Sequence, residues 1–427
     1  MLKLLKIIGL LCCIAGFISQ ATQGQPPPTD TIWLAPDTVW LAPDTIWTPP
    51  DTVWVPSDTV YMQLPAVELQ APPVVMPPDT VWLYLPPDTI MLPPPDTVVT
   101  PPPSGECSSS LLDVSLPLCD GTYSQSITSS TFVSGQIIEA QHPGKVRFTG
   151  AFNSGSNLTF RGVVIDNGNN KTLGANSTYE DMSFIGGPAC GNTVNTQVGS
   201  NVTIRRSAFY GPGGRYLLLS WQQQGLTVED AIFRQDGGWG QGASCNGWEP
   251  TATLANYDSP DFECVGCIAF DGIITVTSES EPLGGLGVNG HNSTSNSLFE
   301  NSLIVNNQAG GFWYDGNGTV GNARVVNSAA YGVVWGINRN VNGTTIATNF
   351  TTDAQCGNWK GSTQLVNSKI AGQSWCSGST SGAGANIQLN TAFLNNPRWR
   401  TELCAGVSRG WCGTSQTLSQ YLSGRMQ

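Results

Sequence analysis

The chain has 427 residues, enough for one large domain with appended segments. Its formal net charge of −12 argues against a nucleic-acid partner, because phosphate binding needs a basic surface. Charged residues make up only 11% of the chain, against about 25% in ordinary globular domains, so uncharged polar residues and Gly must form much of the surface.

Residues 1–24 have the pattern of a secretory signal peptide. Lys3 and Lys6 begin it, an apolar run follows over residues 7–18, and cleavage is expected after Ala21 or Gly24. The apolar run is too short to cross a bilayer comfortably, and no later stretch is suitable. We therefore predict a secreted or cell-surface protein with no transmembrane segment in the mature chain.

Residues 25–106 form a Pro- and Trp-rich repeat. The heptad DT(V/I)WxxP starts at Asp30 and returns, with looser spacing, as far as Asp96. Proline in nearly every copy disfavours a coiled coil, so we predict an extended or disordered stalk. Its regularly spaced Trp side chains leave two interpretations open. The stalk is either a passive spacer or a surface that binds cell-wall glycan, another copy of the chain or the groove of the folded domain.

A short β-rich phrase organises residues 107–394. It first reads LTFRGVVIDN, from Leu158 to Asn167, and seven more copies follow. A repeat with one strand–bend–strand unit is typical of a β-solenoid, whose coils bury their apolar faces only by stacking. Asn and Gly suit the tight corners of such coils. The third-position residues lie 19, 25, 24, 36, 35, 26 and 40 residues apart: Phe160, Tyr179, Ile204, Val228, Cys264, Phe299, Val325 and Leu365.

The segment before the first copy carries a resemblance to a known family. It reads DGTY from Asp120, IIEA from Ile137 and PGKVRFTG from Pro143, and the repeat follows. In this order the chain, from Asp120 to Leu394, resembles parallel β-helix proteins of the pectate-lyase-like superfamily, in particular polysaccharide lyases acting on alginate and chondroitin. The resemblance implies an all-β fold, a single-stranded right-handed parallel β-helix. It also implies that the protein acts on polysaccharide. The matching residues are corner and core residues, so they indicate the fold more than the activity.

Ten cysteines remain after the predicted signal peptide, and this even number favours up to five disulfides in an exported chain. Three local pairs are plausible, and Cys245 would bond to Cys264 or Cys267 to staple a long insertion. The Cys264-x-x-Cys267 motif lacks a second pair of ligands, so no metal site is predicted. The local pairs are Cys107 with Cys119, Cys356 with Cys376, and Cys404 with Cys412; Cys190 is the tenth cysteine.

Three expansions between repeat copies predict long loops, at residues 234–256, 271–291 and 346–362. Insertions in successive coils tend to fall on one face, where a rigid scaffold carries its function. Their side chains Trp239, Trp248 and Trp359 would then wall a groove and stack on sugar rings. The alternative is that the insertions are disulfide-tied decorations.

The resemblance implies a lyase, which removes the proton next to a uronate carboxylate with Lys or Arg, often helped by Ca²⁺. The family's catalytic pair has no positional match in this chain. Arg206, Arg215 and Arg234 lie on neighbouring coils and are the candidates for holding an acidic sugar.

A hydrolase would instead need two carboxylates about 5–9 Å apart across the scissile bond. Asp236, Asp271 and Asp315 are candidates, since adjacent coils can bring them to one face. His291, in the run GGLGVNGHN, and Arg234 are further catalytic candidates.

The tail, residues 395–427, is expected to cap the last coil, because a solenoid needs its terminal apolar face covered. For function we hold two hypotheses. The first is an exported protein that binds or acts on polysaccharide, a lyase or glycoside hydrolase if it is an enzyme. The alternative is a non-catalytic surface protein, such as a fibre, spike or stalked adhesin.

Overall fold

The structure is a computed structural model. It describes residues 106–168, 170–187, 193–196, 200–211, 216–236, 252–273, 284–308, 310–372, 374–405 and 407–426. The chain divides into two compact units, Met1–Asp96 and Thr97–Gln427, and the described residues belong to the second. The predicted signal peptide, and the predicted stalk up to residue 105, lie outside the described residues.

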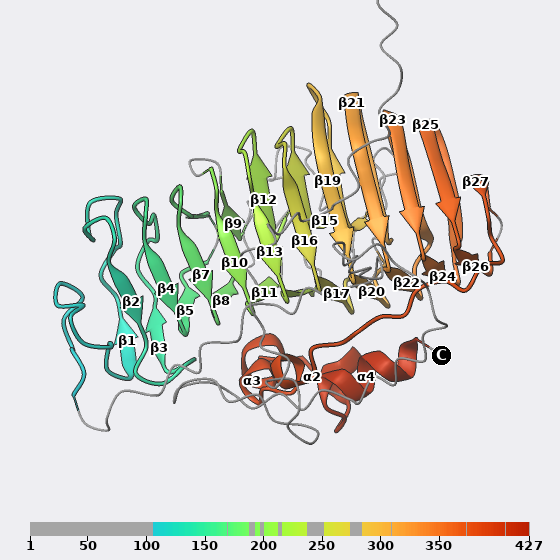
Figure 1. Cartoon of the computed structure of the whole chain (residues 1–427). Coiled ribbons are helices and arrows are strands. Elements are labelled where there is room, and N and C mark those ends of the chain that lie inside the picture. Colours follow the sequence, from blue (N-terminus) through green and yellow to red (C-terminus); the bar gives the residue numbers. More distant parts are fainter. Residues whose placement is uncertain are drawn as a thin grey trace, which may run out of the picture. The chain divides into compact units, whose positions relative to one another are not determined.

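The described unit is a parallel β-helix with three faces (Figure 1). The chain visits the faces in turn: β4 lies on face 2, β5 on face 1 and β6 on face 3, and β7 returns to face 2. Each of these strands pairs in parallel with the equivalent strand of the next coil. The predicted parallel β-helix is therefore confirmed.

The strands of each face follow one another along the axis. Face 1 is an 11-stranded sheet of β1 Gly121–Tyr123, β3 Val146–Phe148, β5 Val163–Asp166, β8 Ser183–Ile185, β11 Ala208–Gly211, β14 Ile232–Gln235, β17 Ile268–Phe270, β20 Leu303–Val305, β22 Ala329–Tyr331, β24 Thr351–Thr352 and β26 Lys369–Ile370. Face 2 comprises β2 Ile137–Glu139, β4 Thr159–Arg161, β7 Thr178–Glu180, β10 Thr203–Arg205, β13 Thr227–Glu229, β16 Phe262–Val265 and β19 Thr294–Glu300. Face 3 comprises β6 Lys171–Thr172, β9 Val194–Asn195, β12 Leu218–Trp221, β15 Ala252–Tyr257 and β18 Gly284–Asn289.

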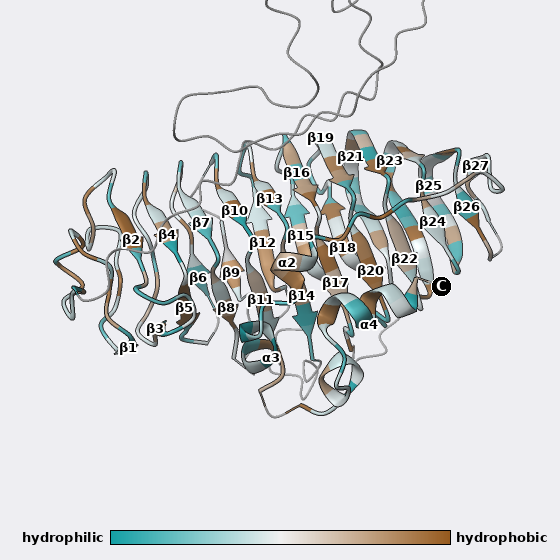
Figure 2. Cartoon of the chain, turned by 60° about the horizontal axis from the view of Figure 1, so that its bottom comes forward, coloured by the Kyte–Doolittle hydropathy of each residue, from teal (hydrophilic) through white to brown (hydrophobic). Residues whose placement is uncertain are grey.

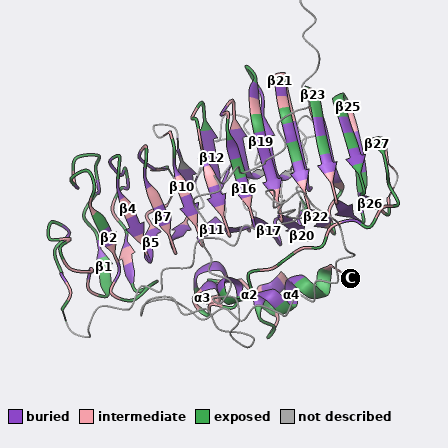
Figure 3. Ribbon diagram, viewed as in Figure 1, coloured by how far each residue is buried: buried purple, intermediate pink, exposed green. Residues whose placement is uncertain are grey.

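Faces 3 and 2 merge in the last coils. The long strand β21, Phe312–Val326, pairs with β18 through its first half and with β19 through its second half. β23 (Trp335–Thr348) and β25 (Gln355–Val366) continue both faces, and β27 (Ser377–Gly378) ends the sheet. In the second halves of β21 and β23, buried residues alternate with more exposed ones (Figure 3). The prediction of a third long loop, at residues 346–362, is therefore wrong, because most of these residues belong to β23 and β25.

Each copy of the repeated phrase forms a face 2 strand, a bend and a face 1 strand. In the first copy these are β4, Gly162 and β5. The bend residue has a positive φ, a conformation that Gly, Asn and Asp tolerate best. The bend residues are Gly162, Asp181, Arg206, Asp230, Gly266, Asn301, Asn327, Asn349 and Asn367.

One copy was not predicted from the sequence. It runs through Ala347 and the bend at Asn349 into β24, and it divides the 40-residue step between Val325 and Leu365. Its inward residue is a small Ala, buried in the core, where most copies have a large apolar side chain. A pattern based on large apolar residues therefore passes over it.

The core is built from rings stacked between coils. Phe184, Phe209 and Phe233 occupy equivalent positions of face 1, and their ring centroids lie 4.9 and 4.7 Å apart. Phe160 stacks on Tyr179 in face 2 in the same way, with the ring planes at 5°. Stacking buries the apolar residue of each coil against its neighbours, as the repeat predicts.

Charged side chains also lie inside the β-helix, among them Arg339 and Lys171. Lys171, in β6, is fully buried and pairs with Val194, whose register partner is Leu218. Its ammonium group donates hydrogen bonds to the backbone carbonyls of Gly168 and Ile185, the latter at 2.7 Å. Burial lowers the pKa of Lys171 to about 7, although the negative charge of Asp166 acts to raise it.

Because the pKa of Lys171 is lowered, we expect the unfolding free energy to depend on pH. Between pH 7 and 10.5 the unfolded lysine is protonated and the folded one is neutral, so the unfolding free energy should rise with pH. The expected slope from this group is about 1.4 kcal/mol per pH unit. Urea unfolding of the wild type and of Lys171→Met at several pH values measures it, with the exposed Lys369→Met as control. A wild-type curve that runs parallel to that of Lys171→Met across this range would contradict the prediction.

The C-terminal tail contains four short helical segments: α2 Thr391–Leu394, α3 Arg398–Leu403, the 3-10 helix η3 Gly410–Gly413 and α4 Leu418–Arg425. They pack on the outward side of face 1, and Figure 2 shows α2 and α4 lying across its strands. The tail approaches them by running back along the axis, with contacts from Ala385 to Thr351 and from Gln388 to Asn301.

This placement corrects the expectation that the tail caps the last coil. Face 1 strands such as β17 and β20 are buried on both sides, so their outward residues also need cover. Ile268 and Leu303 face the tail, whose Leu394, Trp399 and Leu422 complete a second apolar cluster. The β-helix also ends earlier than predicted, since β27 ends at Gly378 and α2 begins at Thr391.

None of the described helices is long and apolar enough to cross a membrane. Among the described residues, no group of three or more His, Cys, Asp and Glu side chains is placed to hold a metal ion.

Candidate functional site

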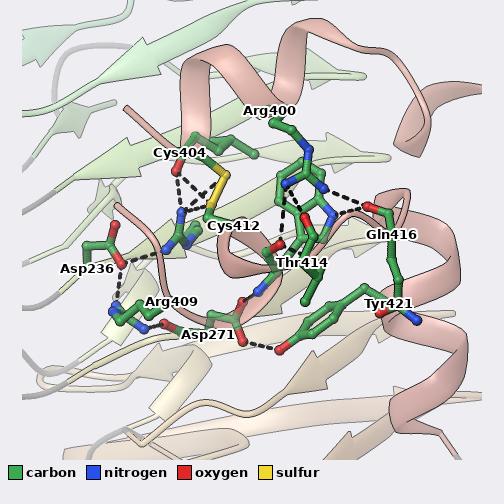
Figure 4. The surroundings of a disulfide bond; sticks show 12 residues. Asp236, Asp271, Arg400, Cys404, Arg409, Cys412, Thr414, Gln416 and Tyr421 are labelled. Atoms are coloured by element: carbon green, nitrogen blue, oxygen red, sulfur yellow. Dashed lines mark hydrogen bonds and ion pairs between the residues drawn. A yellow bond between two sulfur atoms is a disulfide. The ribbon is translucent and has the colours of Figure 1, made fainter. Parts of the chain in front are cut away.

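The structure separates the predicted catalytic residues into two groups. Arg234, Asp236 and Asp271 come together on the outward side of face 1, beneath the tail. Figure 4 shows Asp236 and Asp271 beside the tail residue Arg409. Asp315 belongs to face 3, and His291 follows the face 3 strand β18.

The first group joins the tail to face 1. Arg234 is fully buried, and its Nη2 donates to Asp236 Oδ1 at 2.9 Å. Its Nη1 donates to the carbonyl of Leu403 and contacts the sulfur of Cys412, both in the tail. Arg409, from the tail, pairs with Asp236 as well. Burial lowers the pKa of Arg234, and the charge of Asp236 opposes this shift.

The Asp271 carboxylate is the second anchor of the tail. It accepts hydrogen bonds from the backbone N–H of Trp411 at 2.7 Å, from the Tyr421 hydroxyl at 2.6 Å and from Asn306 Nδ2 at 2.8 Å. Burial, with the hydrogen bond to Asp271, raises the pKa of Tyr421 to about 12. The carboxylate is buried. These contacts assign Asp271 a structural part in holding the tail.

The second group belongs to a row of outward side chains on face 3. In this part of face 3 the residues of one parity, such as Leu218 and Leu286, point into the core, so those of the other parity point outward. Six outward residues stand opposite one another in register on six consecutive strands. This face 3 row is Trp221 (β12), Tyr257 (β15), Asn289 (β18), Asp315 (β21), Asn340 (β23) and Lys360 (β25).

The aromatic end of the row is exposed. The rings of Trp221 and Tyr257 are stacked, with centroids 5.6 Å apart and planes at 15°. Trp221 has 39% of its surface exposed, and the Tyr257 hydroxyl is 2.9 Å from that of Tyr216. An exposed indole is a side chain on which a sugar ring can stack.

A buried indole supports the row from beside it. Trp313 points outward from β21 yet is only 1% exposed, packed with Tyr216, Leu219 and Ala255. Gly287 makes this packing possible, since a Cβ atom there would lie 1.8 Å from the Trp313 Nε1 atom. The outward surface of face 3 is therefore a packed aromatic platform.

The polar end of the row centres on Asp315. Asn340 Nδ2 donates to Asp315 Oδ1 at 3.0 Å. Burial raises the pKa of Asp315, while hydrogen bonds from the Gly316 N–H and Asn340 and the charge of Lys360 oppose the shift. His291 is exposed, and its backbone nitrogen lies close to Gly316. A partly buried carboxyl between two amides can donate or accept hydrogen bonds with a sugar hydroxyl.

Of the other predicted sugar-binding residues, only the side chain of Arg206 is described, and it lies at a bend between faces 2 and 1. Arg206 is a bend residue that makes two hydrogen bonds to the Asp181 carboxylate, at 3.2 and 3.1 Å. Trp359 is part of β25, but its side chain lies outside the described residues. Arg215, Trp239 and Trp248 also lie outside the described residues. By chain order, residues 237–251 and 274–283 both connect a strand of face 1 to a strand of face 3.

Two outward arginines on face 2 are paired with carboxylates. Arg161 pairs with Glu180 at 2.9 Å, and Arg205 pairs with Glu229 at 2.7 Å, in each case one coil away. Arg205 also approaches Glu180, at 3.9 Å. These guanidinium groups are engaged by the protein's own carboxylates.

Four disulfides are present among the described residues. The three predicted local pairs, 107–119, 356–376 and 404–412, are confirmed. The expected bond from Cys245 to Cys264 or Cys267 is wrong, because Cys264 and Cys267 bond to each other across the bend at Gly266, with Cα atoms 5.8 Å apart. Cys190 and Cys245 lie outside the described residues. Disulfides are typical of proteins in oxidising, extracytoplasmic compartments.

Most of the face 3 row was missed by sequence reasoning. A second repeated pattern carried the signal: an apolar strand that ends in an aromatic or polar residue, one per coil. Its copies read LLLSW, TLANY, GLGVN, GFWYD and GINRN and end at Trp221, Tyr257, Asn289, Asp315 and Asn340.

No model of a known protein family matches the chain, and no curated protein matches it. A search of solved structures finds the catalytic unit of a thermostable GH87 alpha-1,3-glucanase from Streptomyces thermodiastaticus strain HF3-3. The TM-score is 0.38, with 12% sequence identity over 62% of this chain and 64% of that chain, so the match spans less than two thirds of that structure.

Proposed function

We propose that this protein binds an uncharged polysaccharide outside the cytoplasm, along the face 3 row. The observation that carries the proposal is the stacked pair of the exposed Trp221 and the half-buried Tyr257, which leads in register into the polar side chains of Asn289, Asp315 and Asn340. Aromatic platforms with a few placed hydrogen-bonding groups suit sugar rings and their hydroxyls.

The row runs across the strands, along the axis of the β-helix. Neighbouring strands lie about 4.8 Å apart, so the six residues from Trp221 to Lys360 extend over roughly 24 Å. A single sugar would contact a small part of this length, whereas an extended chain can contact the whole of it. The geometry therefore favours a polymer.

Charge favours a neutral glycan over an acidic one. The chain has a net charge of −12, and the row itself contains one carboxyl group and one ammonium group. Arg161, Arg205 and Arg206, on face 2 and at its bend, are paired with carboxylates of adjacent coils. Among the described residues, these three guanidinium groups are therefore already engaged and are not available to hold a uronate carboxylate.

Binding is proposed ahead of cleavage. Glycoside hydrolysis needs two carboxyl groups about 5–9 Å apart, and the row provides only Asp315. A lyase would use a base such as Lys360, the exposed ammonium at the end of the row. If the glycan is also cleaved, Asp315, Lys360 and the nearby His291 are the candidates on this face, and the roles predicted for Arg234, Asp236 and Asp271 would need the tail to leave face 1.

Removing the exposed indole should weaken binding. Trp221→Ala is expected to reduce affinity for the bound polysaccharide about tenfold, because it deletes half of the aromatic platform. Affinity electrophoresis of the full chain in gels containing neutral and acidic polysaccharides measures this. Trp375→Ala is the matched control, since Trp375 is 51% exposed and lies outside the row.

The same gels distinguish the alternative function. Retardation by a neutral polysaccharide that is lost in Trp221→Ala supports the proposal. Equal retardation of Trp221→Ala and wild type would move the site away from the row. No retardation by any polysaccharide would favour the structural surface protein.

A further inference from the structure

The face 3 row contains a buried acceptor that has no donor. Asn289 is 6% exposed, and its Oδ1 atom has no hydrogen-bond partner. A buried polar atom without a partner costs free energy, so such an atom in a folded protein calls for an explanation. Its register partner on the next strand is Asp315.

Asp315 lies between Asn289 and Asn340 in the register of the three strands. Asn340 already donates to Asp315 Oδ1 at 3.0 Å. An ionised carboxylate has acceptors only, and it cannot form a hydrogen bond with the Asn289 carbonyl oxygen. A neutral carboxyl group has one O–H donor, which is the group that Asn289 Oδ1 lacks.

We propose that Asp315 is held as a neutral carboxylic acid that bridges Asn289 and Asn340 in one hydrogen-bonded row. The Asp315 O–H donates to Asn289 Oδ1, and Asp315 Oδ1 accepts from Asn340. Burial, which raises the pKa of Asp315, acts in the same direction.

The charged groups around Asp315 come from four elements. Lys360 on β25 is a cation whose charge favours the ionised form. Arg339 on β23 points inward, where it donates to backbone carbonyls of Val320 and Asn342. His291, after β18, is exposed. Asp258, after β15, accepts hydrogen bonds from Asn292.

A neutral Asp315 should make glycan binding depend on pH, an expectation that rests on the proposed function. A polysaccharide that covers the row removes water from Asp315. Burying a neutral, hydrogen-bonded carboxyl costs far less than burying a carboxylate, so the glycan should bind more tightly when Asp315 is protonated. The row would therefore select uncharged sugars and release them as the pH rises.

The first test needs no ligand. The unfolding free energies of the full-length wild type and Asp315→Asn are compared from pH 3.5 to 9. Because the pKa of Asp315 is raised in the folded state, its protonation stabilises the fold fully below pH 3.8, and this stabilisation is lost as the pH rises through the folded-state pKa. The wild type should therefore lose stability relative to Asp315→Asn as the pH rises. Asp261→Asn is the control, because Asp261 occupies an exposed corner where its pKa is lowered and the sign is opposite. A difference between wild type and Asp315→Asn that does not change with pH would overturn the neutral acid.

The second test adds the polysaccharide that gave retardation. Wild-type affinity should fall about tenfold as the pH passes the pKa of Asp315, whereas Asp315→Asn, which keeps a donor, should bind equally at all pH values. Binding that is independent of pH in both proteins would overturn the proposal and leave the glycan site intact. A stability difference that titrates, with no polysaccharide bound at any pH, would support the neutral acid and refute the proposed function.

Discussion

Replacing Asp271 with alanine is expected to lower the unfolding free energy by about 3–5 kcal/mol. The buried carboxylate accepts hydrogen bonds from Trp411, Tyr421 and Asn306, and its loss leaves these donors without an acceptor. Two of the donors belong to the tail, so the tail should detach before the β-helix unfolds. Urea unfolding followed by tryptophan fluorescence measures the loss, because Trp399 and Trp411 are buried only while the tail is in place.

Two variants control this experiment. Asp353→Ala removes an exposed carboxylate that accepts from the Gly332 N–H, and it should have only a small effect. Asp271→Asn keeps the shape but replaces one acceptor by a donor, so an intermediate loss is expected. A loss below about 1 kcal/mol in Asp271→Ala would mean that Asp271 is not an anchor of the tail.

Replacing Phe209 with alanine is expected to cost about 3–5 kcal/mol as well, for a different reason. Its fully buried ring lies between those of Phe184 and Phe233, at 4.9 and 4.7 Å. The substitution removes both stacking contacts and leaves a cavity between coils. Because each coil of a solenoid is stabilised by its neighbours, the damage should extend to the adjacent coils.

Phe209→Leu is the graded control. It retains much of the apolar volume, so it should lose roughly half as much stability or less. Hydrogen exchange should show faster exchange of backbone amides in β8, β11 and β14, and nearly unchanged exchange in distant coils such as those of β1 and β3. Equal losses in the alanine and leucine variants would contradict a cavity as the cause.

The repeated phrase determined much of the fold from sequence alone. Alternating apolar residues with Asn, Asp or Gly at the bend are local features, and they specify a strand, a left-handed corner and a second strand. The three local disulfides were readable for the same reason, since they join residues at most 20 positions apart. The copy at Ala347 was missed because its core residue is small.

The candidate site was only partly predictable. Asp315 was identified, but Trp221, Tyr257, Asn289 and Asn340 were not. The five residues of the row from Trp221 to Asn340 follow one another in the chain at intervals of 36, 32, 26 and 25 residues. Connections of such unequal length hide the register, and only the parallel pairing of β12, β15, β18, β21 and β23 aligns these residues.

The sequence by itself determined a stack of β coils, because each coil follows from residues that are close together in the chain. Only the tertiary structure decided which surface of the stack is covered. Arg234 and Cys412 are 178 residues apart, and no local pattern links them. Docking of the tail removes Arg234, Asp236 and Asp271 from the surface, while the aromatic end of face 3 stays exposed. The reason is physical: coil formation depends on local backbone preferences, whereas exposure depends on which distant apolar surfaces meet.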